Sequence, residues 1–290
     1  NRVFPQSDLA SDVVDALKSY CTQNGVQIRQ AVVTDLRIQE QTVIGVRCED
    51  GTEYFSKHVV IACGGMSYPA TGSTGDGYRL AQQAGHTITE LRPSLVSLVA
   101  NGKDCPALQG LSLKNVAIHV IDTKQKKEIY DDFGEMMFTH YGVTGPMILS
   151  ASSHMRNMEP NRYQISIDLK PALSLEQLDT RLQKDFAENQ NKDFINSLGA
   201  LLPRKLIPIM VAKSGIAPNQ KCNQITKEQR RRFAQELKGF NVMIKGFRPI
   251  DEAIITSGGV SVKEISPKTM ESKLVKGLYF AGEVIDADAY

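Results

Sequence analysis

The sequence predicts an α/β protein in which a nucleotide-binding domain is interrupted by a long insert. Two short apolar runs, VVIACGG at residues 59–65 and LYFAGE at residues 278–283, are typical of buried strands that end at glycine. They lie far apart in the 290-residue chain. Open α/β sheets bind ligands at the carboxyl ends of their strands, where glycine leaves backbone N–H groups accessible. Both strand ends are therefore expected to line one site.

The region before the insert, residues 1–91, has the pattern of a helix followed by strands. Residues 7–24 show the apolar spacing of an amphipathic helix, with Ser7 or Asp8 as the capping residue. Three runs rich in Val and Ile follow, and the Asp-Gly pair at residues 50–51 is a hairpin signal. These elements are expected to form the first part of the nucleotide-binding domain.

The insert is expected at residues 92–250. Runs such as KNVAIHVIDT and KKEIYDDFGEMMFTHYG have the composition of antiparallel strands. Residues 174–238, which include TKEQRRRFAQELKGF, have a helical pattern instead. After the insert, residues 251–290 are expected to return to the nucleotide-binding domain.

The composition is that of an ordinary globular protein. The formal net charge is +2 and the pI is about 8.2, which is too mild to predict nucleic acid or a membrane as a partner. The five cysteines include no C-x-x-C pair, so neither a zinc site nor a disulfide framework is expected. No apolar run approaches the ~20 residues of a membrane span. We expect a cytoplasmic protein that binds no metal.

Residues 70–85, ATGSTGDGYRLAQQAG, place a glycine-rich stretch ahead of a helix. The stretch lacks the lysine of a Walker loop, and Leu80 stands where G-x-G-x-x-G requires its third glycine. Asp76 would also repel a pyrophosphate. The stretch is therefore not a phosphate loop, and two roles for Asp76 stay open: contact with a ligand, or capping of the following helix.

Two residues at the strand ends can be interpreted either as functional or as ordinary structural residues. Glu283 follows Ala281-Gly282, where a carboxylate can accept hydrogen bonds from sugar hydroxyls, and the alternative is a solvated side chain. Cys63 precedes a glycine pair and is either a redox-active thiol or a buried structural cysteine. The absence of a second nearby cysteine favours the structural interpretation.

Three longer motifs resemble one protein family. VVIACGGMSYPATGSTGDGYRLAQQAGH, GEMMFTHYGVTGP and TSGGVSVKEISPKTMESKLVKGLYFAGEVIDADAY are similar to segments of the BaiN/YhiN-type flavoproteins. Members of that family are NAD(P)/FAD-dependent oxidoreductases, some of them aminoacetone-oxidase-like. The resemblance implies an FAD-binding domain of the two-dinucleotide-binding type. It also implies an insert with a β-barrel-like part and a helical part.

The same resemblance implies that the chain is a fragment. A G-x-G-x-x-G segment is expected before residue 1, and a glycine-rich turn with a helix is expected after Tyr290. The pyrophosphate of FAD is expected at the N-terminus of the helix that follows G-x-G-x-x-G. We therefore expect this chain to retain FAD weakly or not at all.

The resemblance also assigns the cofactor contacts. Val33 corresponds to the residue whose backbone meets the adenine, and Glu283 to the acidic residue near the ribityl and pyrophosphate portion. The stretch G-S-T-G-D-G is also similar to a segment that lies close to the flavin in fumarate-reductase-like flavoproteins. TSGGV resembles those enzymes too, but Ile254 and Ile255 stand where they have a histidine, so fumarate is not expected as substrate. The expected cofactor-binding residues are Val33, Ala62, Cys63, Gly64, Gly65, Thr74, Asp76, Gly258, Gly259, Gly282 and Glu283.

His140, in FTHYGVTGP, is the candidate catalytic residue. Histidine transfers protons near neutral pH, although a lone histidine is more often a packed, hydrogen-bonded residue. Arginines at residues 230–232 form a basic run in an expected helix, which is either a solvated face or a nucleic-acid surface.

These observations together predict an FAD-dependent oxidoreductase. NAD(P)H is the expected electron donor, and a small molecule is the expected substrate. No nucleic-acid or membrane partner is expected, and the oligomeric state is not predicted. The alternative is a non-catalytic module that binds RNA or a protein through the insert and the basic helix. A flavin absorption band distinguishes the two.

Overall fold

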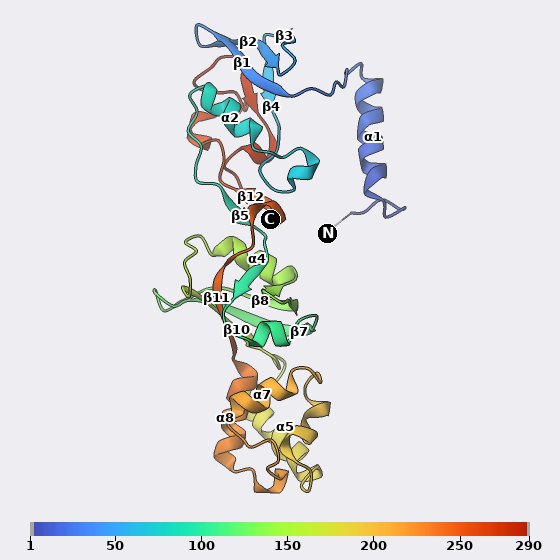
Figure 1. The fold of residues 1–290 in the computed structure, drawn as a ribbon, viewed down its shortest axis with the longest axis vertical. Helices are drawn as coiled ribbons and strands as arrows, with labels where there is room; N and C mark the ends of the chain where they lie inside the picture. Colours follow the sequence, from blue (N-terminus) through green and yellow to red (C-terminus); the bar gives the residue numbers. More distant parts are fainter. Residues whose placement is uncertain (1–2, 289–290) are drawn as a thin grey trace.

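A computed structural model describes residues 3–288 of the chain. Three bodies follow one another along its longest axis: a nucleotide-binding part, a β-barrel and a helical subdomain (Figure 1). The predicted α/β class and the β-barrel insert are confirmed. Because the two ends of the chain meet in the nucleotide-binding part, the candidate site is built from segments that are distant in sequence.

The nucleotide-binding part contains one antiparallel sheet and one parallel strand pair. Gly51, with φ of 83°, lies in the turn between the second and third strands of the antiparallel sheet, so the hairpin signal is confirmed. The parallel pair matches Leu278 with Val59 and Phe280 with Ile61. The elements are β1 (Val33–Gln39), β2 (Thr42–Cys48), β3 (Glu53–Phe55), β4 (Val59–Ile61), α2 (Asp76–Gln83) and β13 (Leu278–Phe280).

The predicted first helix forms, but its start differs from the prediction. α1 comprises Ala10–Gln23 and stands beside the rest of the ribbon in Figure 1. Leu9 occupies the N-cap position without a side-chain bond, so the expected capping by Ser7 or Asp8 is wrong. No residue of α1 is buried. Its apolar side chains are exposed to solvent, because no other element among residues 3–288 packs against them.

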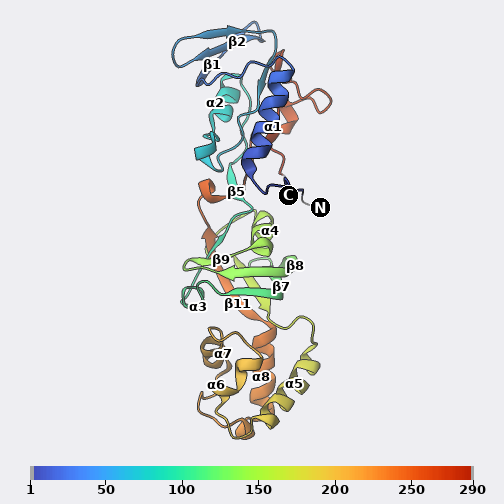
Figure 2. The same ribbon diagram turned by 90° about the vertical axis from the view of Figure 1, so that its right-hand side faces the viewer.

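The barrel closes in the strand order β10-β11-β6-β9-β8-β7. Helix α4 packs against β8, and Pro146 occupies its first turn, where the missing N–H costs no helical bond (Figure 2). Phe138 and Phe240 are fully buried in the barrel and meet edge to face at 6.0 Å. The elements are β6 (Leu98–Ala100), α3 (Asp104–Ala107), β7 (Ser112–Asp122), β8 (Lys127–Phe138), β9 (Gly142–Thr144), α4 (Pro146–His154), β10 (Tyr163–Asp168) and β11 (Phe240–Phe247).

The helical subdomain lies at the far end of the molecule from the nucleotide-binding part (Figure 1). Two of its helices start with capping boxes, Ser174 with Gln177 and Thr226 with Gln229. Phe194 holds their inner faces together. No helix within residues 3–288 is both long enough and apolar enough to cross a bilayer. The helices are α5 (Leu175–Glu188), α6 (Phe194–Ser197), α7 (Ile207–Ser214) and α8 (Lys227–Lys238).

Two short strands connect the barrel to the nucleotide-binding part. The chain enters the insert through β5 (Arg92–Ser94) and returns through β12 (Ile255–Ser257). These strands pair in antiparallel register, with Thr256 opposite Pro93. The chain therefore leaves and re-enters the nucleotide-binding part at the same place.

A buried histidine joins α2 to the segment before β13. The His86 side chain is fully buried, and its Nε2 lies 2.7 Å from Ser272 Oγ. Its Nδ1 lies 3.3 Å from a Glu264 oxygen, but not in hydrogen-bond geometry, so that contact is electrostatic. Glu264 in turn accepts hydrogen bonds from the backbone and hydroxyl of Thr87. Burial lowers the pKa of His86 below its ordinary value of 6.5, and the charge of Glu264 opposes that shift.

We expect this histidine to make the fold acid-sensitive. The unfolded chain binds a proton at His86 as the pH falls below about 6.5, whereas the folded chain resists protonation because its pKa is lowered. The contribution of His86 to the free energy of unfolding is therefore complete above the pKa that His86 has in the unfolded chain. It is lost as the pH falls through the lower pKa of the folded chain. Thermal unfolding at about pH 7.5 and about pH 5.5 should show a smaller acid loss for His86→Gln than for wild type.

His119→Gln is the matched control, because His119 is exposed on the barrel beside Glu128. This variant should keep the acid loss of the wild type. An equal loss in all three proteins contradicts the role assigned to His86.

Candidate functional site

The ends of β4 and β13 meet at Gly65. Parallel neighbouring strands bring their carboxyl ends to the same edge of a sheet. A Cβ at Gly65 would lie 2.5 Å from Thr256 Oγ1 and 2.9 Å from Glu283 Oε1. The predicted meeting of the two strand ends is confirmed, and the absent side chain at Gly65 is what permits it.

Thr256 holds this meeting point together. Its hydroxyl accepts a hydrogen bond from Met66 N at 2.8 Å and lies 3.0 Å from Ser67 Oγ. Its own N–H donates to Glu283 Oε1 at 2.5 Å. The Glu283 carboxylate is thus directed by the backbone rather than solvated freely, and sequence reasoning did not single out Thr256.

Three of the other predicted glycines serve two different purposes. Gly258 and Gly259 have φ of 90° and 148°, and a Cβ on either would strike the backbone of Glu90 or of Val284. These two glycines therefore allow close packing of the chain beside the site. Gly282, with φ of 77°, faces open space. Its backbone is accessible to a ligand.

A cavity of about 640 Å³ lies beside the same strand end. Four of the predicted residues line it: Val33, Cys63, Thr74 and Asp76. Two side chains of α2 fix the wall that contains Val33. Arg79 Nη2 donates to Val33 O at 3.1 Å, and Gln83 Nε2 donates to Thr34 O at 3.1 Å.

Asp76 does not cap the helix. Gly75 occupies the N-cap position of α2, and no side chain makes the capping bond. Asp76 Oδ2 instead accepts from Thr74 Oγ1 at 2.7 Å, and its other oxygen lies 3.7 Å from Arg79. The capping interpretation is therefore wrong, while the ligand-contact interpretation stays a prediction.

Cys63 is not the buried structural cysteine that the sequence favours, because the residue is exposed. Partial burial of its thiol raises the thiol pKa, with a smaller contribution from the charge of Asp76. The thiol is therefore protonated at neutral pH and is a poor nucleophile. Its position in the cavity wall fits contact with a ligand better than redox chemistry.

Tyr78 packs beside the glycine-rich loop, and sequence reasoning did not single it out. The residue is 5% exposed, and its hydroxyl has no hydrogen-bond partner among residues 3–288. Burial raises the pKa of this phenol to about 12, with help from the charge of Glu283. The one feature of the sequence that could have indicated Tyr78 is its place in the first turn of a helix after a glycine-rich loop.

These features fit the cofactor that the sequence motifs imply. The close approach at Gly65 holds Glu283 in place as an acceptor, and the backbone of Gly282 faces open space. FAD carries sugar and ribityl hydroxyls that match such donors and acceptors. The residues that would hold FAD are Gly282 and Glu283 after β13, with Val33 and Asp76 in the cavity wall.

His140 lies on the barrel, at the tip of a tight turn. Thr139 N donates to Gly142 O at 2.8 Å and closes this turn. The His140 ring contacts Tyr141 at 4.9 Å, and the Arg248 guanidinium covers Tyr141 at 4.5 Å. Within residues 3–288, no hydrogen bond joins His140 to Gly65, Thr256 or Glu283. Its catalytic role stays a prediction.

An indirect connection links this turn to the cofactor side. Arg248 pairs with Glu252, with Nε 2.9 Å from a carboxylate oxygen. The neighbouring Asp251 carbonyl accepts a hydrogen bond from Tyr68 N at 3.4 Å. Tyr68 adopts a left-handed conformation with φ of 52° in the loop after Gly65. The His140 turn is therefore connected, through Arg248 and the neighbouring Asp251, to the loop after Gly65.

The basic run on α8 does not form one patch. Arg230 pairs with Asp179 of α5 at 2.8 Å, and the Arg232 guanidinium lies beside Gly215 at the end of α7. Successive helical residues point in different directions, so the charges diverge. The arrangement resembles an ordinary solvated helix face more than a binding surface.

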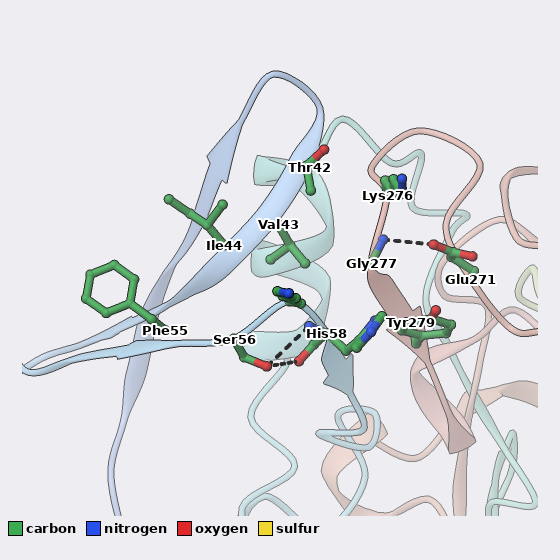
Figure 3. A pocket seen from close by; sticks show the side chains of 11 residues that line it. Thr42, Val43, Ile44, Phe55, Ser56, His58, Glu271, Lys276, Gly277 and Tyr279 are labelled. Carbon is green, nitrogen blue, oxygen red and sulfur yellow. Dashed lines mark hydrogen bonds between the residues drawn. The ribbon is translucent and has the colours of Figure 1, made fainter.

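A second cavity, of about 690 Å³, lies at the opposite ends of the strands (Figure 3). His58 and Tyr279 contribute its aromatic wall, with ring centroids 5.8 Å apart, and Lys276 lies at its rim. Both His58 and Gly277 precede their strands, so this cavity is at the amino ends. Since open α/β sheets bind cofactors at the carboxyl ends, we place the site at Gly65 instead.

This geometry defines a class of protein: one with a dinucleotide-binding domain that is interrupted by a β-barrel. Comparison with known proteins agrees. The family described as "HI0933-like protein barrel and H2TH domain" matches residues 92–255, and "Glucose inhibited division protein A" matches residues 7–95.

Similar proteins include two curated enzymes. The "Ribosomal RNA dihydrouridine synthase" of Haemophilus influenzae is 32% identical over 97% of this chain and 68% of that protein. The "3-dehydro-bile acid delta(4,6)-reductase" of Clostridium scindens is 27% identical over 99% of this chain and 69% of that protein. Among solved structures, GidA of Aquifex aeolicus aligns with a TM-score of 0.33 at 12% identity. That alignment covers 93% of this chain but only 43% of the GidA chain.

The chain belongs to the HI0933-like, BaiN/YhiN-type family of FAD-binding flavoprotein oxidoreductases. The resemblance stated from its motifs is confirmed.

We expect Gly65→Ala to disrupt the site more than the fold. The added methyl group must displace Thr256 and Glu283, which lie within 3 Å of it. Titration with FAD, followed by flavin fluorescence, should show at least ~10-fold weaker binding, because a loss of ~1.4 kcal/mol is tenfold.

Gly199→Ala is the matched control, since its Cβ would meet nothing within 4 Å and its φ is not in the left-handed region. It should bind FAD as the wild type does. Equal FAD affinity of Gly65→Ala and Gly199→Ala would contradict the role assigned to Gly65 in positioning Glu283.

Proposed function

We propose that the protein reduces a carbon–carbon double bond that is conjugated with a carbonyl group, using NAD(P)H as electron donor. The observation that carries the proposal is the contact among Gly65, Thr256 and Glu283 at the strand ends. It forms a site suited to FAD. When bound, FAD supplies hydride transfer between a nicotinamide and an organic acceptor.

The names of the relatives support this reaction class. Dihydrouridine differs from uridine by saturation of a ring double bond conjugated with a carbonyl. A 3-dehydro-bile acid with such double bonds is an enone as well. The substrates differ greatly in size, but the acceptor chemistry is shared. In the balanced reaction the substrate gains a hydride and a proton, and NAD(P)H becomes NAD(P)⁺.

The residues of this chain have three tasks in the reaction. Glu283 and the backbone at Gly282 bind and orient the cofactor, and Val33 meets its adenine end. The barrel, which β12 joins to this site, provides the other wall for the substrate. The His140 turn delivers the proton to the substrate carbon next to the carbonyl, since histidine donates protons at neutral pH.

The test combines measurement of the flavin absorption band with a substrate assay. The purified protein is supplied with FAD and NAD(P)H without oxygen, and NAD(P)H oxidation is followed with either a uridine-containing RNA or a steroid enone. Oxidation with one of them identifies the substrate class. A flavin-loaded protein that oxidises NAD(P)H with neither acceptor contradicts the proposal.

The second candidate is an RNA-binding module without catalysis. Residues 174–238 contain 12 Lys and Arg but only 7 Asp and Glu, in a chain that is otherwise slightly acidic. Polyanion binding through such charges weakens steeply with salt. A protein that stays colourless with FAD but binds RNA in this salt-dependent manner favours the second candidate.

We expect His140→Asn to lower turnover by ~100-fold without changing FAD affinity, because it removes proton transfer but leaves the cofactor site intact. The kcat for NAD(P)H oxidation measures the first effect, and flavin fluorescence the second. The control is His119→Asn at the exposed surface of the barrel. Unchanged turnover of His140→Asn excludes the histidine as proton donor.

A further inference from the structure

The cavity at the amino ends of β4 and β13 has the size and the walls of a small-molecule site. Its volume is about 690 Å³, within the roughly 300–1,000 Å³ that is typical of ligand pockets. Val43, Ile44 and Phe55 give it an apolar side. The His58 and Tyr279 rings lie next to each other, with planes inclined by 56° (Figure 3). The reaction proposed at the carboxyl ends of the strands uses none of these residues.

Backbone contacts form this cavity before any ligand binds. Val43 N donates to Lys276 O at 2.9 Å, which joins β2 to the segment before β13. Val59 N donates to Gly277 O at 3.0 Å, which joins that segment to β4. Gly277 has φ of 79°, and a Cβ there would lie 2.4 Å from Lys57 O. Because main-chain bonds hold the walls, binding a ligand here orders little of the protein.

Two lysines beside the cavity have no anionic partner. Lys57 and Lys276 are both exposed and both line the cavity. Within residues 3–288, neither ammonium group forms an ion pair or a hydrogen bond. The carboxylate that lines the cavity is Glu271, and one of its oxygens accepts a hydrogen bond from Gly277 N at 2.8 Å. The cavity therefore has an excess of positive charge at neutral pH.

We propose that this cavity binds a flat aromatic ring that carries a negatively charged group. The ring lies against Tyr279 and the apolar side, since aromatic faces stack on one another. The charged group faces Lys57 and Lys276, because lysine binds phosphate or carboxylate as a point charge. The second oxygen of Glu271 accepts a hydrogen bond from the ligand. The site goes beyond the proposed function, because it lies at the opposite ends of the strands from the candidate cofactor residues.

Two probes distinguish the sources of the negative charge. AMP carries it on a phosphate, and indole-3-acetate carries it on a carboxylate. Adenosine and indole-3-ethanol are their uncharged counterparts. In calorimetric titrations at low salt, the preferred anion should bind about tenfold more tightly than its uncharged counterpart. The difference should narrow as added salt screens the lysines.

Lys276→Gln should weaken binding of the preferred anion by about threefold to fivefold and leave that of the uncharged counterpart unchanged. Its melting temperature should equal that of wild type, since the Lys276 side chain makes no bond within residues 3–288. Lys268→Gln is the matched control, because it removes the same charge from an exposed lysine outside the cavity. Tyr279→Leu should weaken both the anion and its counterpart, because it removes the ring and no charge.

Four results overturn the inference. Neither anion binds at concentrations up to about 10 mM, or the anions bind no more tightly than their uncharged counterparts. Lys276→Gln and Lys268→Gln bind the anion equally well. Gly65→Ala weakens the binding and Lys276→Gln does not, which places the probe in the cavity at the carboxyl ends. None of these measurements requires FAD, so the proposed function is tested separately.

Discussion

The close approach at Gly65 is the constraint on which the site depends. Three segments, the outermost of which are more than two hundred residues apart, meet at a point with no room for a methyl group. Thr256 supplies the connection, because its hydroxyl bonds the loop after β4 and its N–H bonds the carboxylate after β13. Without that glycine, the acceptor Glu283 and the loop that leads to α2 cannot share one cleft.

The topology explains how a large insert leaves this contact intact. β5 and β12 run antiparallel side by side, so the chain departs and returns through neighbouring strands. The barrel and helical subdomain share one hydrophobic core, whereas the nucleotide-binding part has its own. Each core is formed by its own set of buried residues, and the β5–β12 pair joins the two bodies. Because Thr256 belongs to β12, the return from the insert is also the element that closes the site.

The sequence allowed prediction of features that depend on local pattern. Strand ends, the Asp-Gly hairpin and the antiparallel insert follow from residue type and period, and Gly65 and Glu283 follow from their places after strands. The residues that were missed or misjudged depend on tertiary position. Cys63 is exposed and Asp76 bonds Thr74, although both have ordinary local alternatives. The unpaired hydroxyl of Tyr78 becomes evident only when its neighbours in space are known.

The division between the two cores also bears on specificity. The candidate cofactor-binding residues lie in the nucleotide-binding part, whereas His140 lies in a turn of the barrel. That turn is held by Tyr141 under Arg248, and the Arg248–Glu252 pair is exposed enough to contribute little by itself. The hydrogen bond from Tyr68 to the adjoining Asp251 carbonyl ties the same region to the cofactor loop. Because the two cores are separate, a change in the packing of the barrel need not disturb the packing around Gly65.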